Sequence, residues 1–328
     1  MKNKIIIVSI VVLSLCLVSC ATGEAVKKST EEVPNDGINR LQDGTKYIVH
    51  PDEIRGGGPP KDGIPSLDNP TYVSVQEADE WIEDNELALA IIYKGVKRVY
   101  PLQIMVWHEI VNDDIAGDPV LITYCPLCGS GIAYEPYVEV NGERKASEFG
   151  TSGKLYNSNL VMYDRETDSY WQQIDGNAIV GSAVGQELKE ISIDTVVWRD
   201  WKVAHLDSEV LSQRTGHIRN YGKDPYGSYY EDSFLMFPVD NEDDRVHPKT
   251  IVFGIEVDGK FTAYRESDLI EKGTINDEAF GVTVTRDGAG VVTIVDVNGN
   301  EIVKERDMWF AWYAFHPETA LFGVEPTR

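Results

Sequence analysis

The stretch Pro119–Glu135, PVLITYCPLCGSGIAYE, places two cysteines between two apolar runs. The run PVLITY predicts a buried strand, and the proline and glycine of CPLCG predict a turn where this strand ends. The residues that follow, 131–140, predict a second strand, which ends in an Asn-Gly hairpin signal. Cys125 and Cys128 therefore leave a rigid strand at a turn, close enough to share a metal ion or a disulfide.

The segment before this stretch predicts a hairpin and then a helix. Residues 88–93 and 96–100 are apolar runs joined by a Lys-Gly turn, which is typical of paired strands. The next residues, LQIMVWHEIVND (102–113), follow a proline and carry apolar side chains at helical spacing. His108 and Glu109 project about 100° apart on such a helix, so only one of them is expected to face inward. We expect this residue to be His108, because it lies three positions after a methionine of the apolar face.

The first twenty residues have the composition of a bacterial lipoprotein signal. Two lysines precede an apolar run, residues 5–18, that is too short and too close to the start for a comfortable membrane span. The sequence Leu-Val-Ser-Cys then resembles a lipobox, in which Cys20 becomes the first residue and carries lipid. We therefore expect residues 1–19 to be a signal peptide and the protein to be extracytoplasmic, anchored to the membrane through lipid on Cys20. An Asp directly after the lipid-bearing Cys would retain the protein in the inner membrane. Ala21 stands there instead, which favours the outer membrane in a Gram-negative cell.

The chain is strongly acidic. Its 328 residues carry a formal net charge of −24, and removal of the signal, which holds two lysines and no acid, lowers this charge to −26. Such a surface repels nucleic acids and anionic lipid headgroups. We therefore expect no nucleic-acid partner.

Only two of the four cysteines remain as thiols in the expected mature protein. Cys16 leaves with the signal and Cys20 carries lipid, which leaves Cys125 and Cys128. Outside the cytoplasm free thiols tend to oxidise, so a lone Cys-x-x-Cys there indicates a disulfide, a redox pair or a metal site. A purely structural bridge explains it poorly, because closing so short a loop removes only about 2 kcal/mol of unfolded-chain entropy.

Two pairs of segments repeat along the chain. LALAIIYKGVKRVYPLQI (Leu87–Ile104) resembles TIVFGIEVDGKFTAYRESDL (Thr250–Leu269), with a strand, a Gly turn, a second strand and a helix start. WRDWKVAHLDSEVLS (Trp198–Ser212) resembles WFAWYAFHPETALFG (Trp309–Gly323), with Trp-x-x-Trp, a His and an acid at the same offsets. The predicted fold is therefore α+β but predominantly β, with two related β-rich units from an internal duplication and short helices.

This repeat suggests a division of the chain. Residues 20–45 are rich in Thr, Glu, Lys and Asp and predict a flexible tether. The first β-rich unit, with the CPLCG site, is expected over residues 46–215, a connecting segment over 216–249, and a second, Cys-free unit over 250–328. The connecting segment is rich in Tyr, Gly and Asp, and residues such as Tyr226 either cover the site or bury aromatic rings against both units.

The two units differ at the cysteines. Where the first has PVLITYCPLCGSGIAYE, the second has GVTVTRDGAGVVTIVD (281–296), without Cys or His. A requirement of the fold acts on both units, whereas a functional site needs only one of them. The two cysteines and His108 are therefore predicted to carry chemistry. His205 and His316, which occur in both units beside paired tryptophans, are predicted to be structural.

The region 148–183 is dense in polar side chains that could line a site. The candidates are Tyr156, Asn157, Asp164 and Arg165, together with Tyr221 of the connecting segment. The alternative for each of them is an ordinary turn residue or a hydrogen-bonded polar group of the core.

Several long motifs together resemble one known family. WHEIVND, TYCPLCGS, SGKLYNSNLVMYDRET and YGKDPYGSYY are similar to extracytoplasmic bacterial and archaeal proteins grouped as domain-of-unknown-function family 3179. The resemblance runs from GGGPPKDGIP to WFAWYAFHPETALFG. It implies that these motifs belong to one domain, and it implies no particular activity.

The leading hypothesis for function is a metal site. The thiolates of Cys125 and Cys128 and the imidazole of His108 are ligands that suit copper or zinc. Glu109, His217 or a water would complete the coordination. Three protein ligands and an open position suit metal binding, metal transfer or metal-dependent chemistry in the cell envelope.

Two other classes of function stay open. The first is a thiol–disulfide oxidoreductase in which Cys125 attacks and Cys128 resolves, although Gly-Ser-Gly follows Cys128 where redox enzymes of the thioredoxin type continue a helix. The second is a binding module without catalysis, with an aromatic cleft between the two units. Whether the protein is an enzyme is not decided by the sequence.

Overall fold

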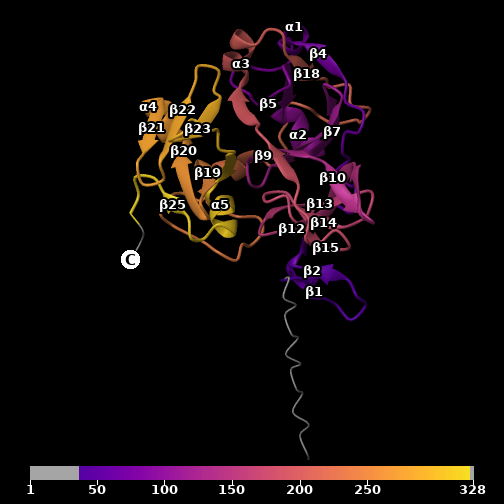
Figure 1. The fold of residues 1–328 in the computed structure, drawn as a ribbon. Coiled ribbons are helices and arrows are strands. Elements are labelled where there is room, and N and C mark those ends of the chain that lie inside the picture. Colours follow the sequence, from indigo (N-terminus) through magenta and orange to yellow (C-terminus); the bar gives the residue numbers. More distant parts are fainter. Residues whose placement is uncertain (1–36, 326–328) are drawn as a thin grey trace, which may run out of the picture.

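The computed structural model describes residues 37–325, which form a β-rich fold with short helices (Figure 1). The predominance of strands that the sequence predicts is confirmed. The predicted signal peptide, Cys20 and most of the predicted tether lie outside the described residues. Within the described range, no helix has the length and apolar character needed to cross a membrane.

The Cys-x-x-Cys turn joins two neighbouring strands of a four-stranded sheet. The sheet has the order β16 (Lys189–Ile191), β9 (Ser130–Glu135), β8 (Asp118–Cys125) and β7 (Ile110–Ile115). Strands β8 and β9 are antiparallel, with Cys125 opposite Ser130. The predicted strand, turn and strand are confirmed, and both cysteines lie where this hairpin turns.

The helix predicted over residues 102–113 is wrong in its second half. Helix α2 (Leu102–His108) ends at His108, because Glu109 has a φ of 59°, in the left-handed region. The chain then enters β7, which pairs with β8 along its whole length. Here the pairing of strands outweighs the helical spacing of the apolar residues.

Two sheets that share the order of four strands contain the segments that repeat in the sequence; the first sheet has one more strand at its edge. The first has the order β17 (Asp194–Val197), β5 (Leu87–Tyr93), β6 (Val96–Pro101), β18 (Glu209–Leu211) and β4 (Tyr72–Ser74). The second has the order β24 (Glu305–Met308), β19 (Ile251–Val257), β20 (Lys260–Arg265) and β25 (Ala320–Leu321). In both, a hairpin forms the centre, its first strand pairs antiparallel with β17 or β24, and its second strand pairs parallel with β18 or β25.

Equivalent helices follow equivalent strands in these two sheets. Helix α3 (Trp198–Ala204) follows β17 and α5 (Trp309–Phe315) follows β24, and the tryptophans that begin them are fully buried. The ring of His205 lies 4.1 Å from that of Trp201, and the ring of His316 lies 4.1 Å from that of Trp312. Both histidines thus pack on an indole, in agreement with the structural role that the repeat predicts.

A seven-stranded sheet covers the cysteine turn. Its order is β1 (Asn39–Arg40), β2 (Lys46–Tyr47), β15 (Ala178–Val180), β14 (Tyr170–Gln172), β13 (Asn159–Asp164), β12 (Phe149–Tyr156) and β3 (Arg55–Gly56). Phe149, Leu160 and Trp171 of this sheet share one apolar core with both cysteines. Strand β1, which pairs with β2, lies within the range 20–45 that the sequence predicts as a tether.

The remaining elements are short helices, hairpins and single turns. They are α1 (Val75–Ala78), α4 (Glu266–Lys272), the pair β10 (Tyr137–Val140) and β11 (Glu143–Ala146), the three-stranded sheet β21 (Thr274–Asp277), β22 (Val282–Arg286) and β23 (Val292–Asp296), and the 3-10 turns η1 (Pro51–Glu53) and η2 (Gly227–Tyr230).

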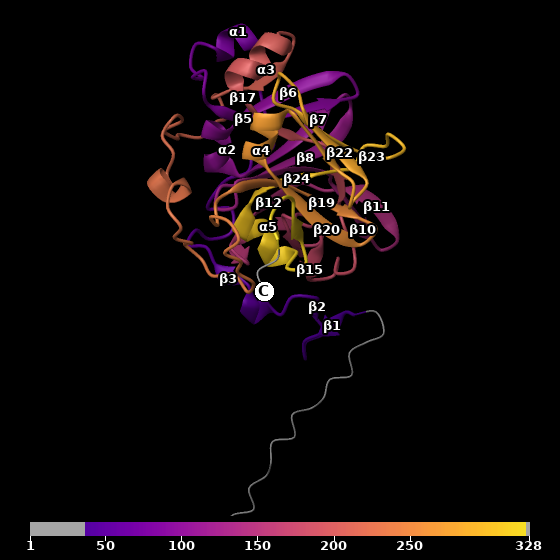
Figure 2. The same cartoon turned by 90° about the vertical axis from the view of Figure 1, so that its left-hand side faces the viewer.

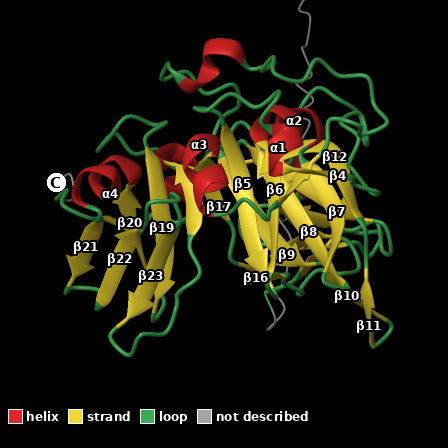
Figure 3. Cartoon of the chain, turned by 90° about the horizontal axis from the view of Figure 1, so that it is seen from above, coloured by secondary structure: helices red, strands yellow, loops and turns green. Residues whose placement is uncertain are grey.

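Residues 221–240, which we call the strap, run along the outside of the sheets (Figures 2 and 3). The Tyr229 hydroxyl donates to the Leu127 carbonyl oxygen of the cysteine turn at 2.9 Å. The Asp240 N–H donates to the side-chain oxygen of Asn157 at 2.9 Å. The buried ammonium of Lys249 donates to the carbonyl oxygens of Tyr229 and Phe234. These bonds fix the strap over the Cys-x-x-Cys turn.

Four carboxyl groups, of which Asp307 is fully buried and the others are partly exposed, lie in the region where β24 packs beside β9. Burial, followed by the charges of neighbouring acids, raises the pKa of Glu190 to about 7 and that of Glu305 well above its usual value. Burial also raises the pKa of Asp307 to about 7, although Ser130 and Arg306 act in the opposite direction. Burial and the charge of Glu187 raise the pKa of Asp175 to about 6. The folded chain therefore holds protons near neutrality that the unfolded chain releases at lower pH.

These raised pKa values predict that the protein loses stability as the pH rises. The contribution of the group is complete below the unfolded pKa values of 3.8 for Asp and 4.5 for Glu, and it is lost as the pH rises through 7. We expect Asp307→Asn to reduce the fall in the free energy of unfolding between pH 5 and pH 8 by on the order of 1 kcal/mol. Urea unfolding at both pH values measures this, with the exposed Glu256→Gln as the control. An unchanged pH dependence in Asp307→Asn would contradict it.

Candidate active site

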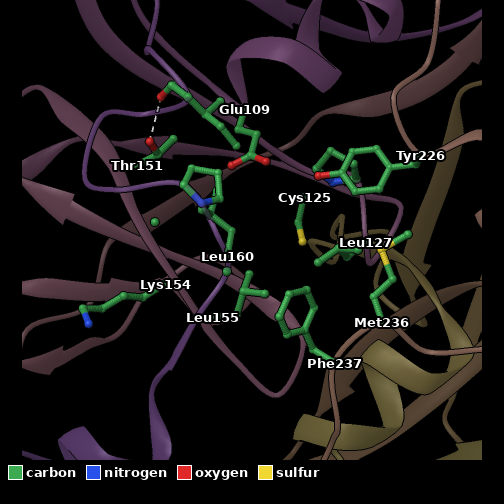
Figure 4. Close-up of a pocket in the computed structure, with 15 residues that line it drawn as sticks. Glu109, Cys125, Leu127, Thr151, Lys154, Leu155, Leu160, Tyr226, Met236 and Phe237 are labelled. Carbon is green, nitrogen blue, oxygen red and sulfur yellow. Dashed lines mark hydrogen bonds between the residues drawn. The ribbon is translucent and has the colours of Figure 1, made fainter.

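Cys125 lies at the wall of a cavity of about 260 Å³ between β12, the cysteine turn and the strap (Figure 4). Most of the other residues at its wall are apolar, and they include Leu155, Leu160 and Phe237. Figure 4 shows the carboxyl group of Glu109, the sulfur of Cys125 and the hydroxyl of Tyr226 around one hollow. The cavity thus brings a thiol, a carboxyl group and a phenol together in apolar surroundings.

The two cysteines are free thiols held by one tight turn. The Cys128 N–H donates to the Cys125 carbonyl oxygen at 3.1 Å, and Gly129 follows with a φ of 64°. Both sulfurs approach the carbonyl oxygen of Ser158, Cys125 at 4.0 Å and Cys128 at 3.5 Å. The side-chain N–H of Asn159 donates to the Cys128 sulfur at 3.5 Å. The thiols therefore share one acceptor, and a second side chain orients Cys128.

The two thiols differ in their surroundings. Cys125 lines the cavity, whereas Cys128 is fully buried behind it. Burial, followed by the hydrogen bond with Cys125, raises the pKa of Cys128 well above its usual value. Cys128 is therefore a protonated thiol at neutral pH, and Cys125 is the thiol that a molecule in the cavity meets first.

Glu109 reaches the cavity because α2 ends in the left-handed region at this residue. A non-glycine residue with this backbone conformation is uncommon, and such strain is concentrated at functional sites. Burial raises the pKa of the Glu109 carboxyl to about 8. At pH 7 the carboxyl group is therefore mainly protonated, so it can donate a proton to a group in the cavity.

Tyr226 closes the cavity from the strap. Burial, followed by the charges of Glu109 and Cys125, raises the pKa of its phenol well above the usual value. The hydroxyl therefore keeps its proton and can donate a hydrogen bond. Of the two alternatives for the connecting segment, this position of Tyr226 favours the one in which the segment covers the site.

The hydrogen-bond partners of His108 are groups other than the thiols. Its Nδ1 is 2.8 Å from the Pro65 carbonyl oxygen and its Nε2 is 2.7 Å from the Tyr221 hydroxyl. Its ring lies 5.3 Å from that of His217. Burial lowers the pKa of His108 to about 4, so the ring is neutral near pH 7. Both ring nitrogens are engaged in holding the Gly/Pro-rich loop and the strap to α2.

The proposed ligands of a metal ion are consequently divided between two places. Glu109 and Cys125 line the cavity, while His108 and His217 lie beside Tyr221. Within residues 37–325, no group of three or more His, Cys, Asp or Glu side chains is arranged to hold a metal ion. The copper or zinc site at these residues stays a prediction.

The other predicted lining residues have structural contacts. Asn157 anchors the strap, and the ring of Tyr156 packs 5.8 Å from that of Phe315. Asp164 accepts hydrogen bonds from the Trp171 indole at 2.8 Å and from Thr167. Arg165 forms an ion pair with Asp68 at 2.9 Å. None of these four is among the described residues at the wall of the cavity.

Sequence reasoning missed most of the cavity wall. Gly57, Pro59 and Ile64 come from the Gly/Pro-rich loop GGGPPKDGIP, whose unusual composition is the one signal that it adjoins a site. Leu155 and Leu160 come from the hairpin β12–β13, and their apolar character is equally typical of a core. Nothing in their local sequence distinguishes a cavity wall from a filled core.

The chain was compared with known proteins. A family model with the description "Protein of unknown function (DUF3179)" matches residues 61–298. No curated protein and no solved structure matches the chain.

Proposed function

Because the chain belongs to the DUF3179 family, whose description assigns no activity, we propose its function from the site: exchange of thiols and disulfides at Cys125 and Cys128. The observation that carries this proposal is the unequal placement of the two thiols. Cys125 faces the cavity, and Cys128 lies buried behind it on the same turn. In two-step exchange one thiol meets the substrate and attacks, and the thiol behind it resolves the mixed disulfide; a thiol at the cavity wall with a second thiol behind it suits these two roles.

The turn is compatible with a disulfide between the two cysteines. A hydrogen bond from residue i+3 to residue i keeps their Cα atoms within about 7 Å. A disulfide requires Cα atoms about 4.4–6.8 Å apart. Closure of the pair therefore needs rotation of side chains but no rearrangement of the sheet.

The reaction has two balanced steps. The Cys125 thiolate attacks one sulfur of a substrate disulfide, so that a mixed disulfide forms and the other half of the substrate leaves as a thiol. Cys128, once deprotonated, then attacks the Cys125 sulfur, and the second half of the substrate leaves as a thiol. The substrate disulfide gains two electrons and two protons, and the two cysteines lose them to form a disulfide.

Glu109 is suited to proton transfer in both steps. It shares the cavity with Cys125, and its carboxyl group is mainly protonated at pH 7. In this proposal the proton that Cys125 loses passes to solvent, and Glu109 gives its proton to the first leaving thiolate. The ionised Glu109 then takes the proton of Cys128, and the second leaving thiolate takes a proton from solvent. Tyr226 donates a hydrogen bond to the sulfur that carries the developing charge.

The experiment that tests the proposal is a stoichiometry of exchange. The reduced protein is treated with a small uncharged disulfide, such as dipyridyl disulfide, and the peptides with Cys125 and Cys128 are identified by mass spectrometry. The proposal predicts two released thiols for each protein molecule and a Cys125–Cys128 disulfide. One released thiol with a persistent adduct on Cys125, or no reaction at Cys125, would contradict it.

A copper or zinc site at the two cysteines stays a prediction, and the same preparation tests it. Elemental analysis of protein purified from the cell envelope gives the metal content, with Cys125→Ser as the comparison. A stoichiometric metal that is lost in Cys125→Ser would favour the metal site over exchange. Under the exchange proposal, the protein contains no such metal and its thiols react as described.

We propose further that the protein is a cell-envelope lipoprotein anchored through Cys20. The basic start, the apolar run and the Leu-Val-Ser-Cys sequence support this proposal. Location outside the cytoplasm suits exchange chemistry, because disulfides form and persist there. Growth of the cells with a radioactive fatty acid tests the anchor. The natural protein is expected to take up the label, and Cys20→Ala is expected to remain unlabelled.

An internal duplication is our proposal for the origin of the two equivalent sheets. It rests on the repeated sequences and on the same strand order around the hairpins β5–β6 and β19–β20. In each case a helix and a three-strand meander follow the hairpin, β7–β9 in the first and β21–β23 in the second. The cysteine turn β8–β9 would then be a specialisation of the turn β22–β23.

A further inference from the structure

The cavity before Cys125 is small and apolar. Its apolar wall is formed by Ile64, Leu127, Leu155, Leu160, Met236 and Phe237. Cys125 itself is 1% exposed, so a reagent meets its sulfur only from within this space. The cavity therefore determines which groups can approach the thiol.

The volume of the cavity limits the size of the group that enters. A closed apolar cavity of about 150 Å³ in another protein is large enough for benzene. The volume of about 260 Å³ here is sufficient for one aromatic ring or one branched alkyl chain, together with the sulfur atoms of a disulfide. A peptide disulfide that had to enter as a whole would be too large.

The wall of the cavity offers little to compensate the charge of an anion. Lys154 is the only cation among the described residues at its wall. Figure 4 shows the ammonium of Lys154 directed away from Cys125, and this group lies 6.0 Å from the Tyr170 ring centre. The carboxyl group of Glu109 is mainly protonated at pH 7 and carries no positive charge for an anion to pair with. The Thr151 hydroxyl is already engaged, because it donates to the Ile64 carbonyl oxygen at 2.7 Å.

We infer that the substrate of Cys125 is a low-molecular-weight, uncharged disulfide in which an apolar ring or branched chain is attached to the sulfur under attack. This inference rests on the proposed exchange function and specifies its substrate class. The apolar wall takes the ring or chain out of water, and the two sulfurs meet the thiol between Glu109 and Tyr226. Anionic disulfides of the glutathione type are disfavoured, because an apolar wall takes their charge out of water without a partner.

The test compares methanethiosulfonate reagents that transfer different groups to a thiol. Benzyl methanethiosulfonate carries an uncharged ring, and the sulfonatoethyl reagent carries an anion. The rate of modification of Cys125 in the full chain is measured by mass spectrometry and divided by the rate of the same reagent with N-acetylcysteine. We expect this normalised rate to be at least about thirtyfold higher for the benzyl reagent, because burial of one aromatic group gives a factor of this order.

Two phenylalanines of the strap provide a matched pair of variants. Phe237 lines the cavity, whereas Phe234 is 66% exposed and lies outside it. Phe237→Ala widens the cavity, and we expect it to reduce the preference for the benzyl reagent by at least about fivefold. Phe234→Ala is expected to keep the preference of the natural protein.

The outcomes separate this inference from the exchange proposal. Three results would overturn the substrate class. The normalised rates of the two reagents could agree within about threefold, the anionic reagent could be the faster one, or Phe234→Ala and Phe237→Ala could lose the preference for the benzyl reagent equally. Exchange that forms the Cys125–Cys128 disulfide without any such preference would leave the exchange function standing and reject the inference. A clear preference at Cys125 without subsequent attack by Cys128 would reject exchange and, with it, the inferred disulfide substrate, although the cavity would still select apolar groups.

Discussion

The Cys128→Ser variant is expected to accumulate a mixed disulfide at Cys125. In the natural protein Cys128 removes the attached group, but a serine hydroxyl cannot displace a thiol from sulfur under these conditions. After brief treatment with a small uncharged disulfide, we expect nearly every Cys128→Ser molecule to carry the adduct. In the natural protein the same adduct should be at least about tenfold less abundant, because the second step consumes it. Intact-mass measurement after acid quenching gives both amounts.

The corresponding Cys125→Ser variant is the control for this experiment. It retains the buried Cys128, whose pKa is raised well above its usual value by burial. We expect no adduct on Cys128 within the same time, because the thiol is protonated and does not line the cavity. An adduct on Cys128 in Cys125→Ser, or equal adduct in Cys128→Ser and the natural protein, would contradict the assigned order of attack.

Gly153→Ala is expected to have the largest effect on stability. Gly153 has a φ of 71°, and an added Cβ would overlap the Pro59 carbonyl oxygen and lie 2.9 Å from the carbonyl carbon of Pro60. Its own carbonyl oxygen accepts the Gly57 N–H at 2.8 Å, so the Gly/Pro-rich loop is held close to β12 at this residue. We expect a loss of about 3 kcal/mol or more in the free energy of unfolding. The displaced loop should also open the cavity and raise the rate of Cys125 modification.

Gly56 provides the comparison for this variant. It lies in the neighbouring strand β3, has no positive φ, and an added Cβ would meet nothing within 4 Å. We expect Gly56→Ala to change the free energy of unfolding by less than about 0.5 kcal/mol. Urea unfolding of both variants tests the argument. Similar stabilities of the two variants would show that the close approach of the Gly/Pro-rich loop to Gly153 does not contribute to the stability of the fold.

The hairpins were predictable from the sequence because their signals are local. The strand PVLITY, the turn CPLCG and the Lys94-Gly95 turn each combine a residue pattern with a turn residue inside a short window. The structure has these strands and turns where the pattern predicts them. Strand pairing over a few residues follows from such patterns without knowledge of the rest of the chain.

The partner of the thiols was not predictable in the same way. On the continuous helix that the sequence predicts, His108 and Glu109 project in different directions, so only one of them is expected to be buried. The helix ends between them, and both side chains are buried in different directions, His108 towards Tyr221 and Glu109 into the cavity. A left-handed Glu gives no signal in sequence, because glycine and asparagine are the usual residues there. Because this signal is absent, the sequence predicts Glu109 only as a metal ligand and not as a group beside the thiol in a cavity.

The most direct test of the central claim is a redox titration of the two cysteines. The protein is equilibrated with graded ratios of oxidised and reduced dithiothreitol, the remaining thiols are alkylated, and the peptides with Cys125 and Cys128 are quantified. Exchange chemistry predicts that both thiols disappear together in one reversible two-electron transition, as a disulfide between them forms. Thiols that both remain open to alkylation across the whole series would contradict a dithiol–disulfide centre at this turn.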